Sequence, residues 1–143
     1  MLPSFCTPGN PLDMTAALCY DSDLYAEGLK TVMDDPNIEM VLIGITIQLV
    51  VSDPTIYNIY NGVKKVVEQG YTKPIAILPF IEGTRNQDVA EKFREIGVPI
   101  LPSPKYAFSA LSHLSKYIAY DCTKRELSLA VPHKKQGPQK GSE

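Results

Sequence analysis

Apolar residues along the chain predict helices that alternate with short extended segments. Residues 21–23 offer N-cap side chains, and apolar positions then recur at helical spacing as far as Met33. The helix is expected to end within 34–37, because Pro36 disfavours helical geometry in the residue before it. Residues 39–50 follow as a dense β-branched run without alternation, which is typical of a strand covered on both faces.

The second helix has the clearest sequence signature. Ser52 or Asp53 supplies its N-cap, Pro54 is its first residue, and Gly70 lies beyond its end. Between these residues, the apolar side chains form a single stripe with helical spacing, made of Ile56, Ile59, Tyr60, Val63, Val66 and Val67. We therefore expect this helix to pack with one side against the core.

Two more strand–helix units are predicted from the same pattern. The apolar segment 74–80 forms a strand, and a helix over 87–96 ends with Gly97 as its C-cap. The short segment 98–101 forms the next strand. An alternation with a spacing of roughly 25 to 30 residues is that of βα units, so the predicted fold class is α/β with a doubly wound parallel sheet.

The C-terminal part begins with Ser103 and Pro104, a cap followed by a first-turn proline. The helix that follows is expected to turn five residues toward the core, namely Ala107, Ala110, Leu111, Leu114 and Ile118. Residues 126–131 are predicted to form a terminal strand, and 132–143 a disordered basic tail. The predicted folded domain is thus 1–131.

The composition is that of one globular domain and argues against several classes of function. The chain has 143 residues, of which 44% are hydrophobic and 21% charged, with a formal net charge of −2. That balance gives no strong field for nucleic acid or an anionic membrane. Three cysteines without a C-x-x-C pair fit reduced thiols in the cytoplasm. The longest apolar run, 40–51, is far shorter than the roughly 20 residues of a membrane span.

Candidate ligand-site or partner-site residues lie where the predicted strands end. In doubly wound sheets, ligands collect beyond the carboxyl ends of the strands, where helix N-termini present free N–H groups. The residues at these positions are Gln48 after the first strand, Glu82, Gly83, Thr84 and Arg85 after the second, and Ser103 after the third. The loop containing Gly83 is the richest, although charged loops are also common simply because loops are solvated.

No pattern of a complete catalytic or metal site is present in the sequence. It contains none of the phosphate-loop, dinucleotide-binding, nucleophile-elbow or zinc-protease motifs. Its two histidines, His113 and His133, have no metal-ligand partner three or four residues away. We therefore expect no catalytic residue, no metal site and no cofactor bound by this chain alone.

The segment Gly9-Asn10-Pro11-Leu12-Asp13-Met14-Thr15 carries a family motif. It resembles the G-N-P-[VL]-D-[LM]-T motif of NDP-forming acyl-CoA synthetases, the ADP-forming acetate–CoA ligase group related to succinyl-CoA synthetase. Similar pieces follow in order, among them Lys73-Pro74-Ile75-Ala76 and Gly97-Val98-Pro99-Ile100, so the resemblance covers about residues 8 to 120. It makes Asn10 and Asp13 candidate site residues, although both can instead close a local turn around Pro11.

The resemblance implies one part of a larger enzyme, the second flavodoxin-like or CoA-ligase domain, with a three-layer fold. The family makes acyl-CoA through an acyl phosphate and a phosphohistidine, using CoA and ATP or ADP with Mg in the assembled enzyme. Partners with a CoA-binding and phosphohistidine part and an ATP-grasp part are therefore implied. Two rival hypotheses keep the fold without the chemistry: a non-catalytic module that binds CoA or nucleotide, and a structural interaction domain.

One departure from the family concerns the start of the domain. In the family, a strand–helix unit precedes the N-P-x-D motif, whereas only eight residues precede Gly9 here. A sheet that lacks this unit leaves ladder N–H and C=O groups unpaired. We therefore expect the chain to pair with a partner subunit or another copy of itself, or to rearrange its strand order.

Overall fold

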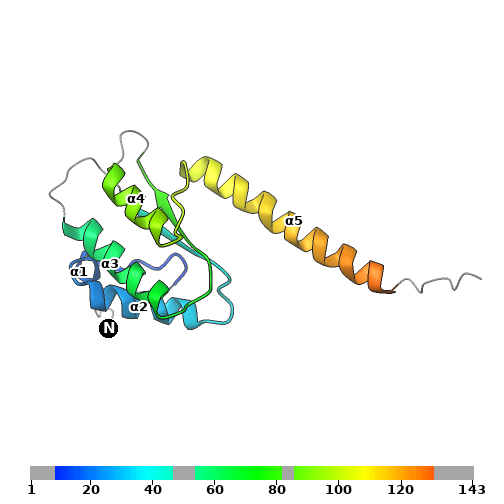
Figure 1. Ribbon diagram of the computed structural model, residues 1–143, viewed down its shortest axis with the longest axis horizontal. Coiled ribbons are helices and arrows are strands. Elements are labelled where there is room, and N and C mark those ends of the chain that lie inside the picture. The colour runs from blue at the N-terminus through cyan, green and yellow to red at the C-terminus, as the bar shows by residue number, and fades with distance from the viewer. Residues whose placement is uncertain (1–8, 47–53, 82–85, 131–143) are drawn as a thin grey trace, which may run out of the picture. The chain divides into compact units, whose positions relative to one another are not determined.

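The computed structural model describes residues 9–46, 54–81 and 86–130, with side chains up to 121. Its elements are helices α1 (Thr15–Cys19), α2 (Ser22–Asp34), α3 (Pro54–Glu68), α4 (Gln87–Glu95) and α5 (Pro104–Ala130), and strands β1 (Val41–Ile45) and β2 (Ile75–Pro79) (Figure 1). The chain divides into two compact units, Met1–Ala107 and Phe108–Glu143. No helix in the described part is long and apolar enough to cross a membrane.

A parallel pair of strands forms the centre of the first unit. β1 and β2 pair in parallel along all five residues of each strand. A third extended segment joins β2 through one bridge, between Ile77 and Ile100. The N–H of Ile77 donates to the Pro99 carbonyl at 2.9 Å, and the N–H of Leu101 donates to the Ile77 carbonyl at 2.9 Å. The predicted strand 98–101 is therefore present only as a single bridge.

Helices α2, α3 and α4 cover one face of the sheet. Their apolar side chains and the inward side chains of β1 and β2 form one core cluster. The Tyr60 ring of α3 meets the Phe93 ring of α4 edge-on, with centroids 5.4 Å apart. On the opposite face, the Phe80 ring lies so close to Gly44 that a Cβ there would meet it at 2.2 Å. The expectation that β1 is covered on both faces is wrong at Gly44, which is exposed.

The helix boundaries agree with the local sequence signals. The Asp21 carboxylate caps α2 by accepting hydrogen bonds from the N–H groups of Asp23 at 2.8 Å and Leu24 at 3.1 Å. α2 ends at Asp34, before Pro36, as predicted. α3 begins at Pro54 as predicted, and its expected cap residues lie outside the described residues.

Glycines in the left-handed region end α3 and α4. Gly70 has φ +85°, and its N–H donates to the Val67 carbonyl at 3.0 Å. Gly97 has φ +76° and donates to Arg94 at 3.0 Å, while the next N–H, of Val98, reaches back to the Phe93 carbonyl at 2.9 Å. The second pattern is a Schellman turn, which directs the chain back along the sheet.

The sequence reading was wrong at two elements. α1, a helix of five residues, was not predicted. The predicted terminal strand 126–131 is also wrong, because α5 continues as a helix through Ala130. No glycine or proline occurs between Lys105 and Ala130, so nothing in the sequence interrupts the helix that begins at Pro104.

The apolar residues of α5 fall in two units. Ala107 belongs to the first unit and is buried. Ala110, Leu111, Leu114 and Ile118 belong to the second unit, whose described residues are the part of this helix from Phe108 to Ala130. A single helix cannot bury an apolar stripe by itself, and the packing of these four residues on the core stays a prediction.

The α/β class and the parallel pairing are confirmed by the structure. A two-stranded parallel sheet with helices is consistent with a fragment of a flavodoxin-like fold. The three-layer, doubly wound arrangement stays a prediction. The boundary at 131 also stays a prediction, because 131–143 lie outside the described residues.

Gly62 allows α2 and α3 to approach closely, which predicts a sensitive position. A Cβ at Gly62 would meet Tyr25 Cδ1 at 2.9 Å and the Ser22 carbonyl oxygen at 3.0 Å. We expect Gly62→Val to lower the free energy of unfolding, measured in urea, by about 2 kcal/mol more than Asn61→Val does. Asn61 is an exposed neighbour on the same helix, so it controls for helix propensity. Equal losses for the two variants would contradict the close approach.

Candidate functional site

The carboxyl edge of the sheet is described only in part. The candidates Gln48 and Glu82 to Arg85 lie outside the described residues. What is described are the exposed apolar side chains of Phe80 and Ile81 after β2, and the N-termini of α4 and α5. The residues before these two helices, Asn86 and Ser103, are the buried polar side chains of the described part.

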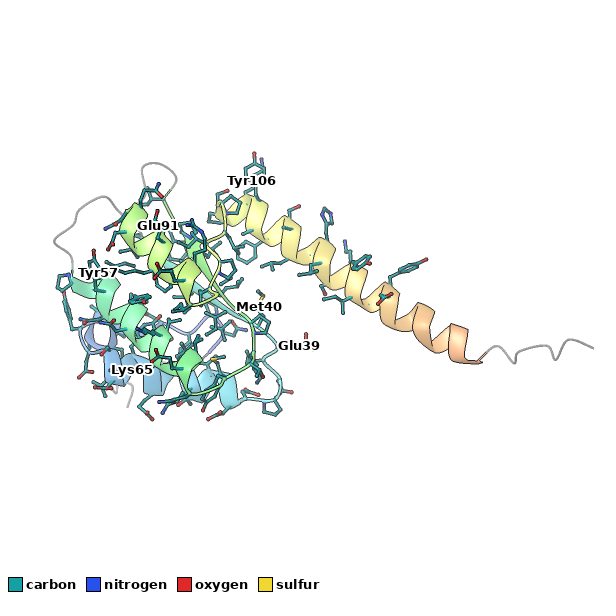
Figure 2. All side chains as sticks on the ribbon, in the orientation of Figure 1. Glu39, Met40, Tyr57, Lys65, Glu91 and Tyr106 are labelled. Atoms are coloured by element: carbon teal, nitrogen blue, oxygen red, sulfur yellow. The ribbon has the colours of Figure 1, made fainter. Side chains whose placement is uncertain are left out.

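Asn86 forms a complete N-cap at α4. Its side-chain oxygen accepts a hydrogen bond from the Val89 N–H at 3.2 Å, and its carbonyl accepts one from the Ala90 N–H at 3.1 Å. Asp88 adds a carboxylate in the first turn and accepts a hydrogen bond from the Tyr57 hydroxyl at 3.2 Å. Figure 2 shows Tyr57 near the start of α3. This contact links the N-terminal turns of α3 and α4.

Ser103 holds the same position at α5 but does not complete the cap. Its carbonyl accepts a hydrogen bond from the Ala107 N–H at 2.8 Å, which makes it the N-cap residue. The residue is only 2% exposed, and its hydroxyl oxygen has no hydrogen-bond partner. A buried hydroxyl without a partner is uncommon, because it loses its bonds to water and gains none.

The motif segment before α1 is held by local contacts. The Asp13 carboxylate accepts a hydrogen bond from the Thr15 N–H at 2.8 Å, which closes an Asx turn after Pro11 and not around it. Asn10 is exposed, and the Asn10–Pro11 peptide bond is cis. The Met14 side chain packs on α2 at Gly28, where a Cβ would meet Met14 Cε at 2.6 Å.

Thr15 is a feature that sequence reasoning missed. It has φ +56°, which is rare for a β-branched residue, and its buried hydroxyl oxygen has no hydrogen-bond partner. Its place as the last residue of the family motif was the only signal in the sequence. Neither the backbone angle nor the missing partner follows from the residue type.

The structure places the sequence-predicted residues on different elements. Asn10 and Asp13 precede α1, which packs on α2 and α3. The junction after α1 is fixed to α3 by a hydrogen bond from the Asn58 amide to the Tyr20 carbonyl at 3.0 Å. Ser103 instead follows the segment that pairs with β2. The described residues therefore include two separate groups of candidates.

Tyr25 in α2 and Asp35 directly after it have shifted pKa values, and both shifts have structural causes. Burial raises the pKa of the Tyr25 phenol, with a smaller contribution from Cys19. Hydrogen bonds from the Asn37 N–H and the Asn37 amide hold the pKa of the exposed Asp35 carboxyl below its usual value. Among the described residues, no group of histidine, cysteine, aspartate and glutamate could hold a metal ion.

Comparison with known proteins gives one similar enzyme. No family model matches the chain, and no solved structure matches it significantly. A trans-feruloyl-CoA synthase from an unknown prokaryotic organism is 29% identical over 131 residues, which cover 90% of this chain and 17% of that enzyme. The chain therefore spans a small part of its relative and is similar to part of an acyl-CoA synthetase. The NDP-forming subclass stays a prediction.

The two caps predict opposite effects of the same kind of substitution. We expect Asn86→Ala to lower the free energy of unfolding by about 1 kcal/mol, because it removes a cap hydrogen bond. Ser103→Ala should leave it unchanged or raise it by up to about 1 kcal/mol, because it removes a buried hydroxyl that has no partner. Urea unfolding of both variants measures the difference. A loss at Ser103 as large as the loss at Asn86 would show that the hydroxyl is bonded.

Proposed function

We propose that this chain is the CoA-ligase domain of an NDP-forming acyl-CoA synthetase and that it acts only together with partner domains. The observation that carries the proposal is the ordered family match that begins at Gly9–Thr15. It is supported by the similarity of 90% of the chain to part of a trans-feruloyl-CoA synthase. An aromatic acid such as ferulate and a small acid such as acetate are accordingly the two acyl substrates to test.

The chemistry of the described residues supports a dependence on partners. The described edge of the sheet provides helix caps and exposed apolar side chains, and the described residues include no metal-binding group. The match covers 17% of the relative, so most of that enzyme lies outside it. In this proposal, CoA-binding, phosphohistidine and ATP-grasp parts supply the reacting groups, and the assembled enzyme binds CoA and ATP or ADP with Mg.

The outer edge of β1 offers a place for a partner. The N–H of Val41 donates to the Pro74 carbonyl at 2.9 Å, and the Ile45 carbonyl accepts from the Phe80 N–H at 3.1 Å, so both groups face β2. Because backbone groups alternate along a strand, those of Leu42 and Gly44 face away from β2. In the described part of the chain, no strand pairs with them. An added strand would widen the two-stranded sheet toward the larger sheet that the resemblance implies.

A complementation assay tests the proposed function. The trans-feruloyl-CoA synthase would be expressed without its matched segment, and this chain supplied in trans or fused in place of that segment. We expect formation of an acyl-CoA from CoA, ATP and either ferulate or acetate, with ADP and phosphate as the nucleotide products. The chain alone should show no turnover, since it lacks the reacting groups of the partners.

Two controls sharpen the assay. The truncated synthase without this chain should be inactive, and a fusion carrying Asn61→Val, a surface change on α3, should remain active. Release of AMP in place of ADP would contradict the NDP-forming assignment. Turnover by the isolated chain would contradict the need for partners.

A non-catalytic binding module is the second candidate function. It is compatible with the Asx turn at Asp13, which gives this residue of the family motif a local structural role. Calorimetry of the isolated chain with CoA in the same experiment separates the two candidates. CoA binding without restored turnover would favour the module.

The unpaired edge of β1 also predicts self-association when no partner is present. We expect sedimentation of the isolated chain to show a weight-average mass that rises above the monomer at micromolar concentration, because edge backbone groups are a template for another strand. Leu42→Pro, which removes an outward-facing N–H at a residue that already carries a Cβ, should shift the chain toward monomer. A concentration-independent monomer would count against an incomplete sheet.

A further inference from the structure

The first turn of α5 leaves backbone donors without partners. The first N–H groups of any helix have no acceptor within it. In α5, Pro104 has no N–H, and the Ala107 N–H is bonded to the Ser103 carbonyl at 2.8 Å. The N–H groups of Lys105 and Tyr106 therefore remain as the donors of this turn. Figure 2 shows Tyr106 at this end of the helix.

The buried Ser103 hydroxyl is a second, independent observation at this end of the helix. An N-cap side chain lies over the first-turn N–H groups, so a serine hydroxyl there normally accepts one of them. The Ser103 hydroxyl accepts none, although the residue is only 2% exposed. At the corresponding position of α4, the Asn86 side chain does accept such a bond. At α5, the N-cap side chain is therefore a hydroxyl group that can still donate and accept hydrogen bonds.

The charges around the α5 N-terminus are also the reverse of those at α2 and α4. A helix N-terminus carries partial positive charge, which a nearby carboxylate usually balances. The first turns of α2 and α4 contain Asp23 and Asp88, whereas the first turn of α5 contains no acidic residue. It contains Lys105, whose ammonium lies 5.7 Å from the centroid of the Tyr106 ring. This end of α5 is thus a positive pole with an added cation.

We propose that the N-terminus of α5 binds a phosphate group. The Ser103 hydroxyl, the N–H groups of Lys105 and Tyr106, and the Lys105 ammonium are its donors. Four donor groups suit a tetrahedral dianion with several acceptor oxygens better than a planar carboxylate with two. The site also lies beyond the carboxyl end of a segment paired with β2, where ligands collect in α/β sheets. This inference stands on the α5 geometry alone and does not require the proposed enzymatic function.

A titration of the whole chain with inorganic phosphate tests the site. Backbone amide resonances would be followed at constant ionic strength, with acetate titrated in parallel as the carboxylate. We expect the amides of Lys105 and Tyr106 to shift and saturate with phosphate, and to shift less with acetate. Ser103→Ala should weaken phosphate binding about fivefold, because one hydrogen bond is lost. Lys105→Gln should weaken it about two- to fivefold.

Matched variants separate binding from folding. Ser109→Ala changes an exposed serine of the same helix and should bind phosphate like the unmodified chain. Ser103→Thr keeps a hydroxyl at the cap and should retain binding. Lys105 is exposed, so Lys105→Gln tests the site even where a change at Ser103 disturbs folding.

Three results would overturn the phosphate site. They are amide shifts that do not saturate, equal responses to phosphate and acetate, and unchanged phosphate binding in both Ser103→Ala and Lys105→Gln. The titration needs no partner domain and no acyl substrate. Its failure would therefore leave the complementation assay unaffected, and inactivity in that assay would leave the phosphate site standing.

Discussion

The described first unit depends on the parallel pairing of β1 and β2 beneath a single layer of helices. The inward side chains of both strands are buried by α2, α3 and α4 in one cluster, and Gly62 lets α2 and α3 approach closely enough to close that layer. Parallel sheets are usually covered on both faces. Here, the second face is buried at Ala76 and Leu78 of β2, but Gly44 of β1 is exposed with the Phe80 ring against it. No described strand pairs with the outer edge of β1. The core therefore stabilises this unit but leaves the outer edge of β1 and the face at Gly44 available for packing against other polypeptide.

Features set by neighbouring residues were predictable, whereas features set by distant contacts were not. The cap at Asp21, the stop before Pro36, the start at Pro54 and the left-handed glycines Gly70 and Gly97 all act within one helical turn, so the sequence alone indicates them. Whether 98–101 forms a full strand or one bridge depends on how far it pairs with β2, which its apolar character does not specify. The terminal strand expected at 126–131 failed because short apolar runs fit helix and strand alike, and the uninterrupted helix from Pro104 extended through them.

At the candidate site, the positions of residues could be predicted from the sequence, but their hydrogen bonds could not. Sequence reasoning placed Ser103 at a helix start beyond a strand. The structure confirms the helix start, whereas the segment before Ser103 pairs with β2 through a single bridge. It could not show that the hydroxyl is buried without a partner while the Asn86 side chain, in the corresponding position of α4, accepts a hydrogen bond from the Val89 N–H. Thr15 makes the point more strongly, because its motif position was visible but its φ of +56° and its unpaired hydroxyl were not. For Asp13, the structure shows a turn-closing role that the residue type already allowed.

The proposed function divides the chemistry between this chain and partner domains. Acyl-CoA formation needs groups that activate a carboxylate and transfer it, and helix caps with hydrogen-bond donors can orient anions but cannot perform those steps. The described residues provide helix caps, hydrogen-bond donors and exposed apolar side chains at the edge of the sheet. The chain is similar to a small part of a longer enzyme. Two surfaces of the described part suit different binding partners. The positive N-terminal end of α5 attracts an anion. The unpaired edge of β1 can form backbone hydrogen bonds with another strand. A partner could add a strand at β1 while a phosphate-bearing ligand binds at the N-terminus of α5, so both surfaces can be occupied in the same assembly.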